Sequence, residues 1–174
     1  RTLTRLDASG IAIGKIQLSA GLEVRPSERP GAAIADDLAR FAEDVYLHQV
    51  TESQAVAVDV RPVDIRQTRN GGVSVGSLRR WLDLPDALAD VRARERFDAT
   101  WRIHFHVPLF REELGPFHGT QAYLAALLAR VRTRRIAPHL EVETYTWDVL
   151  PEEHRQVPVA VAVARELSWV KERL

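Results

Sequence analysis

The sequence contains no cysteine, which excludes disulfide bonds and thiol chemistry and agrees with a reducing cytoplasm. It also lacks methionine, and lysine occurs only at positions 15 and 171. The net charge is zero and no long basic run is present, which argues against the broad cationic surface of a nucleic-acid-binding protein. No apolar run reaches the length of a membrane span. We therefore expect a cytoplasmic protein without a nucleic-acid partner.

The 174 residues, 45% of them hydrophobic, are enough for one core. They are few for a complete eightfold barrel, which takes about 250 residues. Residues 1–10 are typical of the tail of a helix ended by glycine, and a strand pattern follows at once. We expect residues 1–174 to form one partial domain that lacks its N-terminal half.

The most informative segment is residues 101–110, WRIHFHVPLF. Side chains two residues apart on a strand share a face, so His104 and His106 point the same way. Ile103, Phe105 and Val107 point the other way. A strand that is apolar on one face and carries paired imidazoles on the other indicates a site.

Two further segments alternate in the same manner. Residues 11–20 place Lys15 and Gln17 on one face, and residues 139–147 place four polar or aromatic side chains on one face: Glu141, Glu143, Tyr145 and Trp147. An antiparallel sheet with one solvated face shows the same alternation. Helical patterns separate the three segments, however, and this order favours a parallel sheet covered by helices. We therefore predict an α/β fold of the (β/α)8 TIM-barrel type, with the polar faces in its lumen.

The rest of the sequence predicts four helices, one further strand and a β-hairpin outside the main strand–helix repeat. Helices are expected at residues 32–44, 85–97, 120–135 and 159–174, with Asp83 as a cap of the second and Thr120 of the third. Residues 45–50 are predicted as a strand, and a β-hairpin excursion is expected around residues 45–80.

Imidazole and carboxylate groups from three strands point to a divalent metal site, with zinc or manganese as the ion. We predict His104 and Glu143 as metal ligands, and His106, Glu141 and Lys15 as catalytic groups. Substrate contacts are expected from the following residues: Gln17, His48, Tyr145 and Trp147. The alternative is a satisfied polar network without a reaction, in which the histidines bond to the glutamates across neighbouring strands.

The segments at residues 15–20, 46–50, 101–110 and 139–151 resemble the metabolite-traffic protein EboE family, whose members are similar to xylose-isomerase-like TIM barrels. The resemblance implies that the chain is the C-terminal half of such a barrel, with about strands six to eight. By position it assigns the strand-eight ligand to Glu143 and the strand-six ligand to Gln17, where the wider group has histidine. It also implies an upstream strand with further ligands and a membrane-protein partner of the same pathway.

Residues and resemblance together predict a metal-dependent isomerase or epimerase acting on a small sugar-like or phosphorylated metabolite. A metal-dependent hydrolase with the same ligands is the nearest variant. The alternative from another class is a non-catalytic binding or partner protein of a metabolite-export system, because a fold by itself does not define a function. Open strand edges further predict a homo-oligomer.

Overall fold

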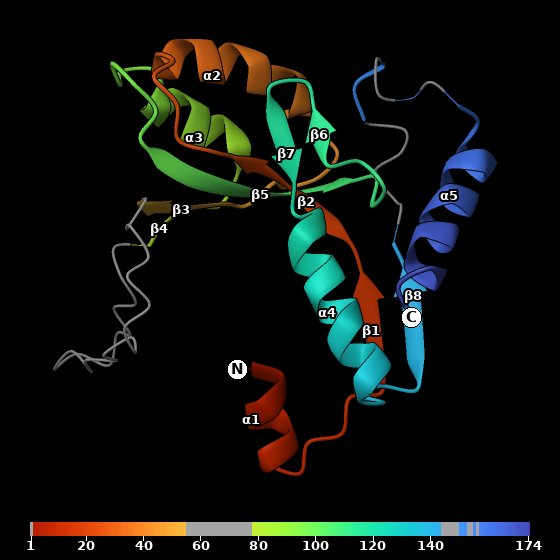
Figure 1. The fold of residues 1–174 in the computed structure, drawn as a ribbon. Coiled ribbons are helices and arrows are strands. Elements are labelled where there is room, and N and C mark those ends of the chain that lie inside the picture. The colour runs from red at the N-terminus through yellow and green to blue at the C-terminus, as the bar shows by residue number, and fades with distance from the viewer. Residues whose placement is uncertain (1, 55–77, 144–149, 153–154, 156) are drawn as a thin grey trace, which may run out of the picture.

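The computed structural model describes residues 2–54, 78–143, 150–152, 155 and 157–174 (Figure 1). Helices and strands alternate irregularly along the chain, and two β-sheets result. None of the described helices is long and apolar enough to cross a bilayer.

The smaller sheet consists of two parallel strands that are far apart in the sequence. β1 (Lys15–Leu18) pairs with β8 (His139–Val142), with Lys15 opposite His139 and Leu18 opposite Val142. Parallel strands need a crossover between them. Here that connection contains the whole larger sheet and then helix α4 (Gln121–Thr133), which leads directly into β8.

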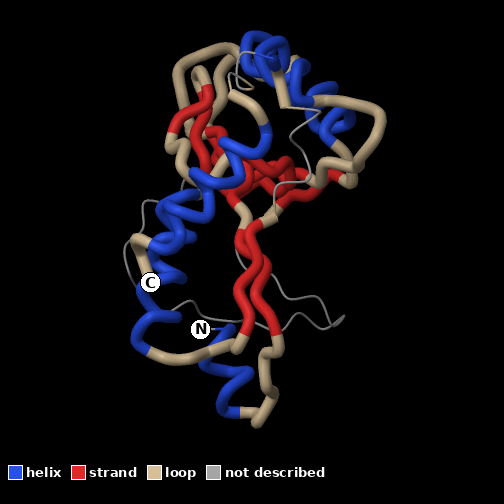
Figure 2. Tube along the Cα trace, turned by 90° about the vertical axis from the view of Figure 1, so that its right-hand side faces the viewer, coloured by secondary structure: helices blue, strands red, loops and turns tan. Residues whose placement is uncertain are grey.

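The larger sheet has six strands in the order β4-β3-β5-β2-β7-β6, and every pair in it is antiparallel. Its strands are β2 (Ala20–Val24), β3 (Val50–Gln54), β4 (Arg79–Trp81), β5 (Ala99–Val107), β6 (Glu113–Leu114) and β7 (Phe117–Gly119). Only Ser19 separates β1 from β2, so one extended segment takes part in both sheets. Figure 2 shows the two parallel strands leading up into the larger sheet.

Two pairs of helices cover the sheets. α2 (Gly31–Leu38), with the short 3-10 helix η1 (Ala39–Phe41), and α3 (Leu84–Val91) lie over one face of the larger sheet (Figure 1). α4 and α5 (Val159–Lys171) run beside β1 and β8, and α1 (Thr2–Ala8) lies at the far end (Figure 1). The core combines the apolar faces of both sheets with these helices, and its largest fully buried side chain is Trp101.

The predicted α/β class is confirmed, but the arrangement of the strands differs from the expectation. Residues 101–107 form a strand, yet β5 is antiparallel to both of its neighbours and is not a barrel strand beside β1 and β8. The antiparallel alternative was therefore the right one for this segment. The described residues contain no closed barrel.

Local predictions were right for helices and less accurate for strands. The four predicted helices are present as α2 with η1, α3, α4 and α5, each somewhat shorter than expected. The strand predicted at residues 45–50 is wrong, because β3 begins only at Val50. A β-hairpin was predicted around residues 45–80, and β3 and β4 do form an antiparallel pair there. The connection between them, residues 55–77, lies outside the described part of the chain.

Two polar caps behave differently. The side chain of Asp83 accepts a hydrogen bond from the backbone N–H of Leu84 at 2.8 Å and so caps α3, as predicted. It also accepts from the N–H of His48 at 2.9 Å, which ties the segment before β3 to this helix. Thr120 does not cap α4 with its side chain; its Oγ1 accepts from the N–H of Gly21 at 2.9 Å instead.

Gly31 allows α2 and α3 to approach each other closely. A Cβ atom at this position would lie 1.9 Å from the carbonyl oxygen of Val91, which is backbone and cannot rotate away. We expect Gly31→Ala to destabilise the protein by about 1–3 kcal/mol, the usual range for overpacking. Urea denaturation followed by circular dichroism measures this difference.

Gly14→Ala is the matched control, because its Cβ would meet no atom within 4 Å and its φ is not positive. We expect it to leave stability unchanged or to raise it slightly through the unfolded state. Equal destabilisation by both substitutions would contradict the close helix contact.

Candidate active site

The candidate site lies at the carboxyl ends of β1 and β8. The chain leaves β1 through Ser19 and enters β2, where Gly21 lies opposite His106 of β5. At the end of β8, the N–H of Glu143 donates to the carbonyl oxygen of Leu18 at 3.1 Å and extends the parallel pairing by one residue. The antiparallel strand β5 therefore brings its histidines to the edge where both parallel strands end.

His104 and His106 are on one face of β5, as predicted from their spacing, and their Nε2 atoms are 3.1 Å apart. The rings are tilted by 47° to each other, with centroids 5.1 Å apart. Two imidazole nitrogens bound to one tetrahedral zinc ion at 2.0–2.1 Å would be about 3.3 Å apart. The pair thus has nearly the separation that a shared cation would require.

The other nitrogen of each ring faces an oxygen. Nδ1 of His104 is 2.8 Å from Oε1 of Gln49, and Nδ1 of His106 is 3.9 Å from Oε2 of Glu143. The amide oxygen only accepts, so Nδ1 of a neutral His104 carries the proton and its Nε2 is a bare lone pair. His104 thus has the pattern usual in metal-binding histidines, in which an oxygen orients the second nitrogen, whereas the 3.9 Å between His106 and Glu143 is too long for a hydrogen bond.

The contact between the two rings requires a choice of tautomer. If Nε2 of neutral His106 donates to Nε2 of His104, the Nδ1 lone pair of His106 faces the carboxylate of Glu143. A cation between the two Nε2 atoms would remove this conflict, because His106 could then present Nδ1–H to Glu143. A cation between the rings is therefore an alternative to the direct contact at 3.1 Å that the structure has.

Burial keeps the imidazole of His106 neutral at pH 7. The side chain of His106 is 6% exposed, and desolvation, together with the nearby His104 and His48, lowers the pKa of His106 to about 4. A ring that stays neutral at pH 7 keeps a lone pair for a ligand. Desolvation likewise lowers the pKa of His48, although Glu43 and Asp83 oppose the shift.

Lys15 and Glu141 form an ion pair on the exposed face of the parallel sheet. Nζ of Lys15 is 2.5 Å from Oε2 of Glu141, and both side chains are about half exposed, at 50% and 52%. Gln17, which is opposite Glu141 in the register, is also exposed. The polar faces predicted for these two strands are thus confirmed, while their apolar side chains pack against the core: Ile16, Leu18, Leu140 and Val142.

His48 differs from its expected place at a substrate. It is 1% exposed and its ring lies against Phe105, with centroids 4.9 Å apart. Its Nε2 is 3.4 Å from Oε1 of Glu43. In this structure His48 is packed in the interior against Phe105 and does not present a surface to a ligand.

Of the predicted site residues, the structure brings together His104, His106 and Glu143, with His48 behind them. Lys15, Gln17 and Glu141 share the exposed face of the parallel sheet. Tyr145 and Trp147 lie outside the described residues. Gln49 was not predicted, although its place directly after His48 in a polar segment offered a weak signal.

Within the described part of the chain, no group of three or more His, Asp or Glu side chains is arranged to hold a metal ion. The histidine pair would supply two nitrogen ligands, and Oε2 of Glu143 is 3.9 Å from Nδ1 of His106. Catalytic zinc sites usually have three protein ligands and one open position, so the pair is one ligand short of that pattern.

Comparison of the chain with protein-family models, with curated proteins and with solved structures finds no match. The resemblance to the EboE family therefore stays a prediction, and the geometry of the histidine pair is the basis on which a function can be inferred.

Proposed function

We propose that the chain is a divalent-metal-dependent enzyme of the isomerase or epimerase type, acting on a small sugar-like or phosphorylated metabolite. The observation that carries this proposal is the convergence of the Nε2 atoms of His104 and His106 at 3.1 Å, with Oε1 of Gln49 2.8 Å from Nδ1 of His104 and Oε2 of Glu143 3.9 Å from Nδ1 of His106. Zinc and manganese are the ions we consider first, because both accept imidazole nitrogen.

The proposal assigns different roles to the two glutamates of the β8 segment. Glu143 and Gln49 orient His106 and His104 through their Nδ1 atoms. Glu141 is on the same face as Glu143, about 7 Å along the strand by ordinary strand geometry, and moves a proton. Lys15 holds this carboxylate in place, and Gln17 beside it contacts substrate. A bound divalent ion would polarise a carbonyl or enediolate oxygen.

The scaffold supports this assignment by analogy. A parallel strand pair with a helix before the second strand is the repeating unit of an (β/α)8 barrel, and barrel enzymes place their active sites at the carboxyl ends of the strands. We propose that β1 and β8 are neighbouring strands of a xylose-isomerase-like barrel. In that case the segment from β2 to β7 is an insertion between a barrel strand and its helix, and it delivers the histidines to the site.

Metal binding is the direct test. After treatment with a chelator, the protein is titrated with ZnCl2 and MnCl2 by isothermal calorimetry. We expect one ion per chain, with affinity lowered at least about 100-fold by His104→Ala or His106→Ala, and about 10- to 100-fold by Glu143→Gln, which acts through the orientation of a ligand.

His139→Ala is the matched control, because this histidine is exposed at the start of β8. It should leave the affinity for both ions unchanged. Metal binding that survives both substitutions in β5, or that falls equally in the control, would contradict the assigned ligands.

Catalysis is tested by proton exchange. The metal-loaded protein is incubated with pentose and hexose phosphates in D2O, and 1H NMR follows loss of the C–H signal next to the carbonyl. Exchange that disappears in Glu141→Gln, with metal affinity retained, supports the enzyme. Metal binding without exchange would favour a binding protein of the kind that serves metabolite export.

A further inference from the structure

A cavity with a basic side lies at the end of the two parallel strands opposite the histidine pair. It has a volume of about 470 Å³ and is enclosed by α1, by the segment before β1 and by the end of α4 with the residues before β8. The histidine pair is at the carboxyl ends of β1 and β8, whereas this cavity is at their amino ends. Its volume falls within the range of small-molecule sites.

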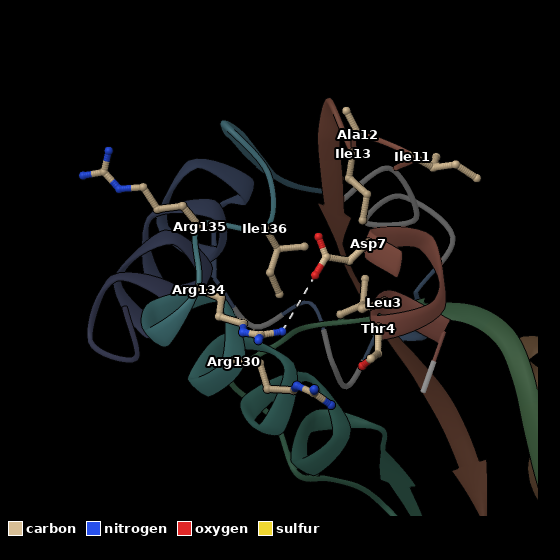
Figure 3. A pocket seen from close by; sticks show the side chains of 10 residues that line it. All are labelled: Leu3, Thr4, Asp7, Ile11, Ala12, Ile13, Arg130, Arg134, Arg135 and Ile136. Carbon is tan, nitrogen blue, oxygen red and sulfur yellow. Dashed lines mark ion pairs between the residues drawn. The ribbon is translucent and has the colours of Figure 1, made fainter. Parts of the chain in front are cut away.

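The polar side of the cavity is basic. Arg130 is in the last turn of α4 and Arg134 follows the helix directly, and Figure 3 shows both extending toward α1. Arg135 also lines the cavity, but Figure 3 shows its side chain extending away from α1. The one acidic side chain among the lining residues is Asp7, whose Oδ2 is 4.0 Å from Nη1 of Arg134. Both partners are largely exposed, at 79% and 67%, so this ion pair contributes little.

The carbonyl oxygen of Arg130 accepts hydrogen bonds from the N–H of Arg134 and from Oγ1 of Thr133, but its guanidinium group makes no hydrogen bond or ion pair within the described part of the chain. Favourable interaction of arginine with a helix C-terminus explains part of this arrangement. It does not explain why the two guanidinium groups border a cavity, or why the facing wall is apolar. The cavity therefore keeps an excess of positive charge on one side.

The remaining wall is mainly aliphatic. It is formed by Leu3 of α1, by Ile11 and Ile13 before β1 and by Ile136 before β8. Figure 3 shows Ile136 and Leu3 close to Arg134, with Ile13 on the chain segment that leads into β1. A ligand in this cavity would meet guanidinium groups at one end and aliphatic carbon along its body.

We propose that this cavity binds an organic phosphate monoester with a short apolar body. Two guanidinium groups at the C-terminal end of α4 suit a phosphate dianion, which accepts several charge-assisted hydrogen bonds. The aliphatic wall then removes the body of the ligand from water. This site does not depend on the proposed metal-dependent activity and shares no residue with it.

The test is a calorimetric titration of the whole chain with hexyl phosphate, with inorganic phosphate and 1-hexanol as separate arms. We expect hexyl phosphate to bind one to one and more tightly than either part alone. Arg130→Ala and Arg134→Ala should each weaken binding at least about tenfold, because each removes charge-assisted hydrogen bonds. Ile136→Ala should weaken binding of hexyl phosphate and leave that of inorganic phosphate unchanged.

Arg132→Ala is the matched control, because Arg132 is exposed on the same helix and does not line the cavity. It makes the same change in net charge and should leave affinity unchanged, and thermal unfolding shows that each variant is folded. No binding of hexyl phosphate, equal loss in the control, or equally tight binding of inorganic phosphate would overturn the proposal. Sedimentation with phosphatidylcholine vesicles that contain phosphatidic acid tests whether the phosphate belongs to a membrane lipid. Binding to these vesicles without binding of hexyl phosphate would also overturn the proposal.

Discussion

Trp101→Ala is expected to lower the free energy of unfolding by about 3–5 kcal/mol, the range for truncating a large buried aromatic side chain. Trp101 is fully buried in β5, and its ring centroid lies 5.3 Å from that of Phe97 and 5.4 Å from that of Trp81. A loss of this size is a large part of the 5–15 kcal/mol that stabilises a typical domain.

The indole also belongs to a polar network beneath the sheet. Its Nε1–H donates to Oε2 of Glu52 at 2.6 Å, and Nη1 of Arg94 is 2.6 Å from the same oxygen. Glu52 is 6% exposed, so it depends on these two donors for its hydrogen bonds. Trp101→Ala therefore removes packing and weakens the support of a buried carboxylate at once.

Urea denaturation of Trp101→Phe and Trp101→Ala separates the loss of the hydrogen bond to Glu52 from the loss of packing. Trp101→Phe keeps an aromatic ring and removes the donor, so we expect it to cost less than Trp101→Ala. Leu82→Ala, at an 80% exposed position, is the control and should change stability by less than about 0.5 kcal/mol. A cost for Trp101→Ala as small as that of the control would mean that this side chain is not part of the core.

Glu166→Gln is expected to stabilise the protein at pH 8 by up to about 3 kcal/mol and to have almost no effect at pH 4. Glu166 on α5 is 3% exposed, and burial raises the pKa of its carboxyl group to about 7, from an ordinary value of 4.5. Its Oε1 accepts from the N–H of Leu109 at 3.0 Å, and its Oε2 has no hydrogen-bond partner in the described part of the chain. A glutamine keeps the acceptor for Leu109 without the charge.

The direction of the pH dependence follows from the raised pKa. Below pH 4.5 the carboxyl group is protonated in both states, and its contribution to stability is fully present. Between pH 4.5 and about 7 the unfolded chain releases this proton while the folded chain retains it, so stability falls as pH rises. The difference between a pKa of 4.5 and one of about 7 for Glu166 corresponds to roughly 3 kcal/mol in the free energy of unfolding. Above pH 7 the loss is complete.

Urea denaturation of both proteins between pH 4 and pH 8 measures this effect as the difference between variant and wild type. The lowered pKa of His106 also makes the protein less stable as pH falls below about 6.5. This contribution is the same in the variant and in the wild type, so it cancels in the difference between them. Glu172→Gln, exposed near the end of the same helix, is the control and should show a constant difference. A constant difference for Glu166→Gln would contradict the buried charge.

The prediction for residues 101–107 shows how far a local pattern reaches. Alternation correctly placed the histidines on one face and Ile103 and Phe105 on the other, because successive side chains of any strand point to opposite faces. It did not reveal the direction of the neighbouring strands. Parallel and antiparallel sheets with one polar face have the same alternation, and the helices between the segments suggested the wrong choice for β5.

The pairing of β1 with β8 shows the opposite case. Both strands, their polar faces and their parallel direction were predicted, but as strands six and eight with residues 101–107 between them, whereas in the structure they are direct neighbours. What could not be predicted is that six antiparallel strands are formed by the residues between them. Short strands such as β6 and β7 have too few residues for a period of two to be visible.

For the candidate site, residue type and spacing were sufficient to select His104, His106 and Glu143. Contacts across the fold were needed to show that Glu143 faces Nδ1 of His106 and that Gln49 faces Nδ1 of His104. They also showed that His48 is buried against Phe105. Burial and the identity of a ring's neighbours depend on elements distant in the sequence, so no local pattern contains them.

The sequence by itself determined the α/β class, the helices, the faces of the main strands and the residue types available for chemistry, because these follow from backbone periodicity and side-chain chemistry over a few neighbouring residues. Only the tertiary structure decided the direction in which strands pair, the meeting of β5 with the ends of β1 and β8, and the burial that lowers the pKa of His106 and raises that of Glu166. These properties arise from packing between segments separated by tens of residues, where many arrangements satisfy the same local pattern.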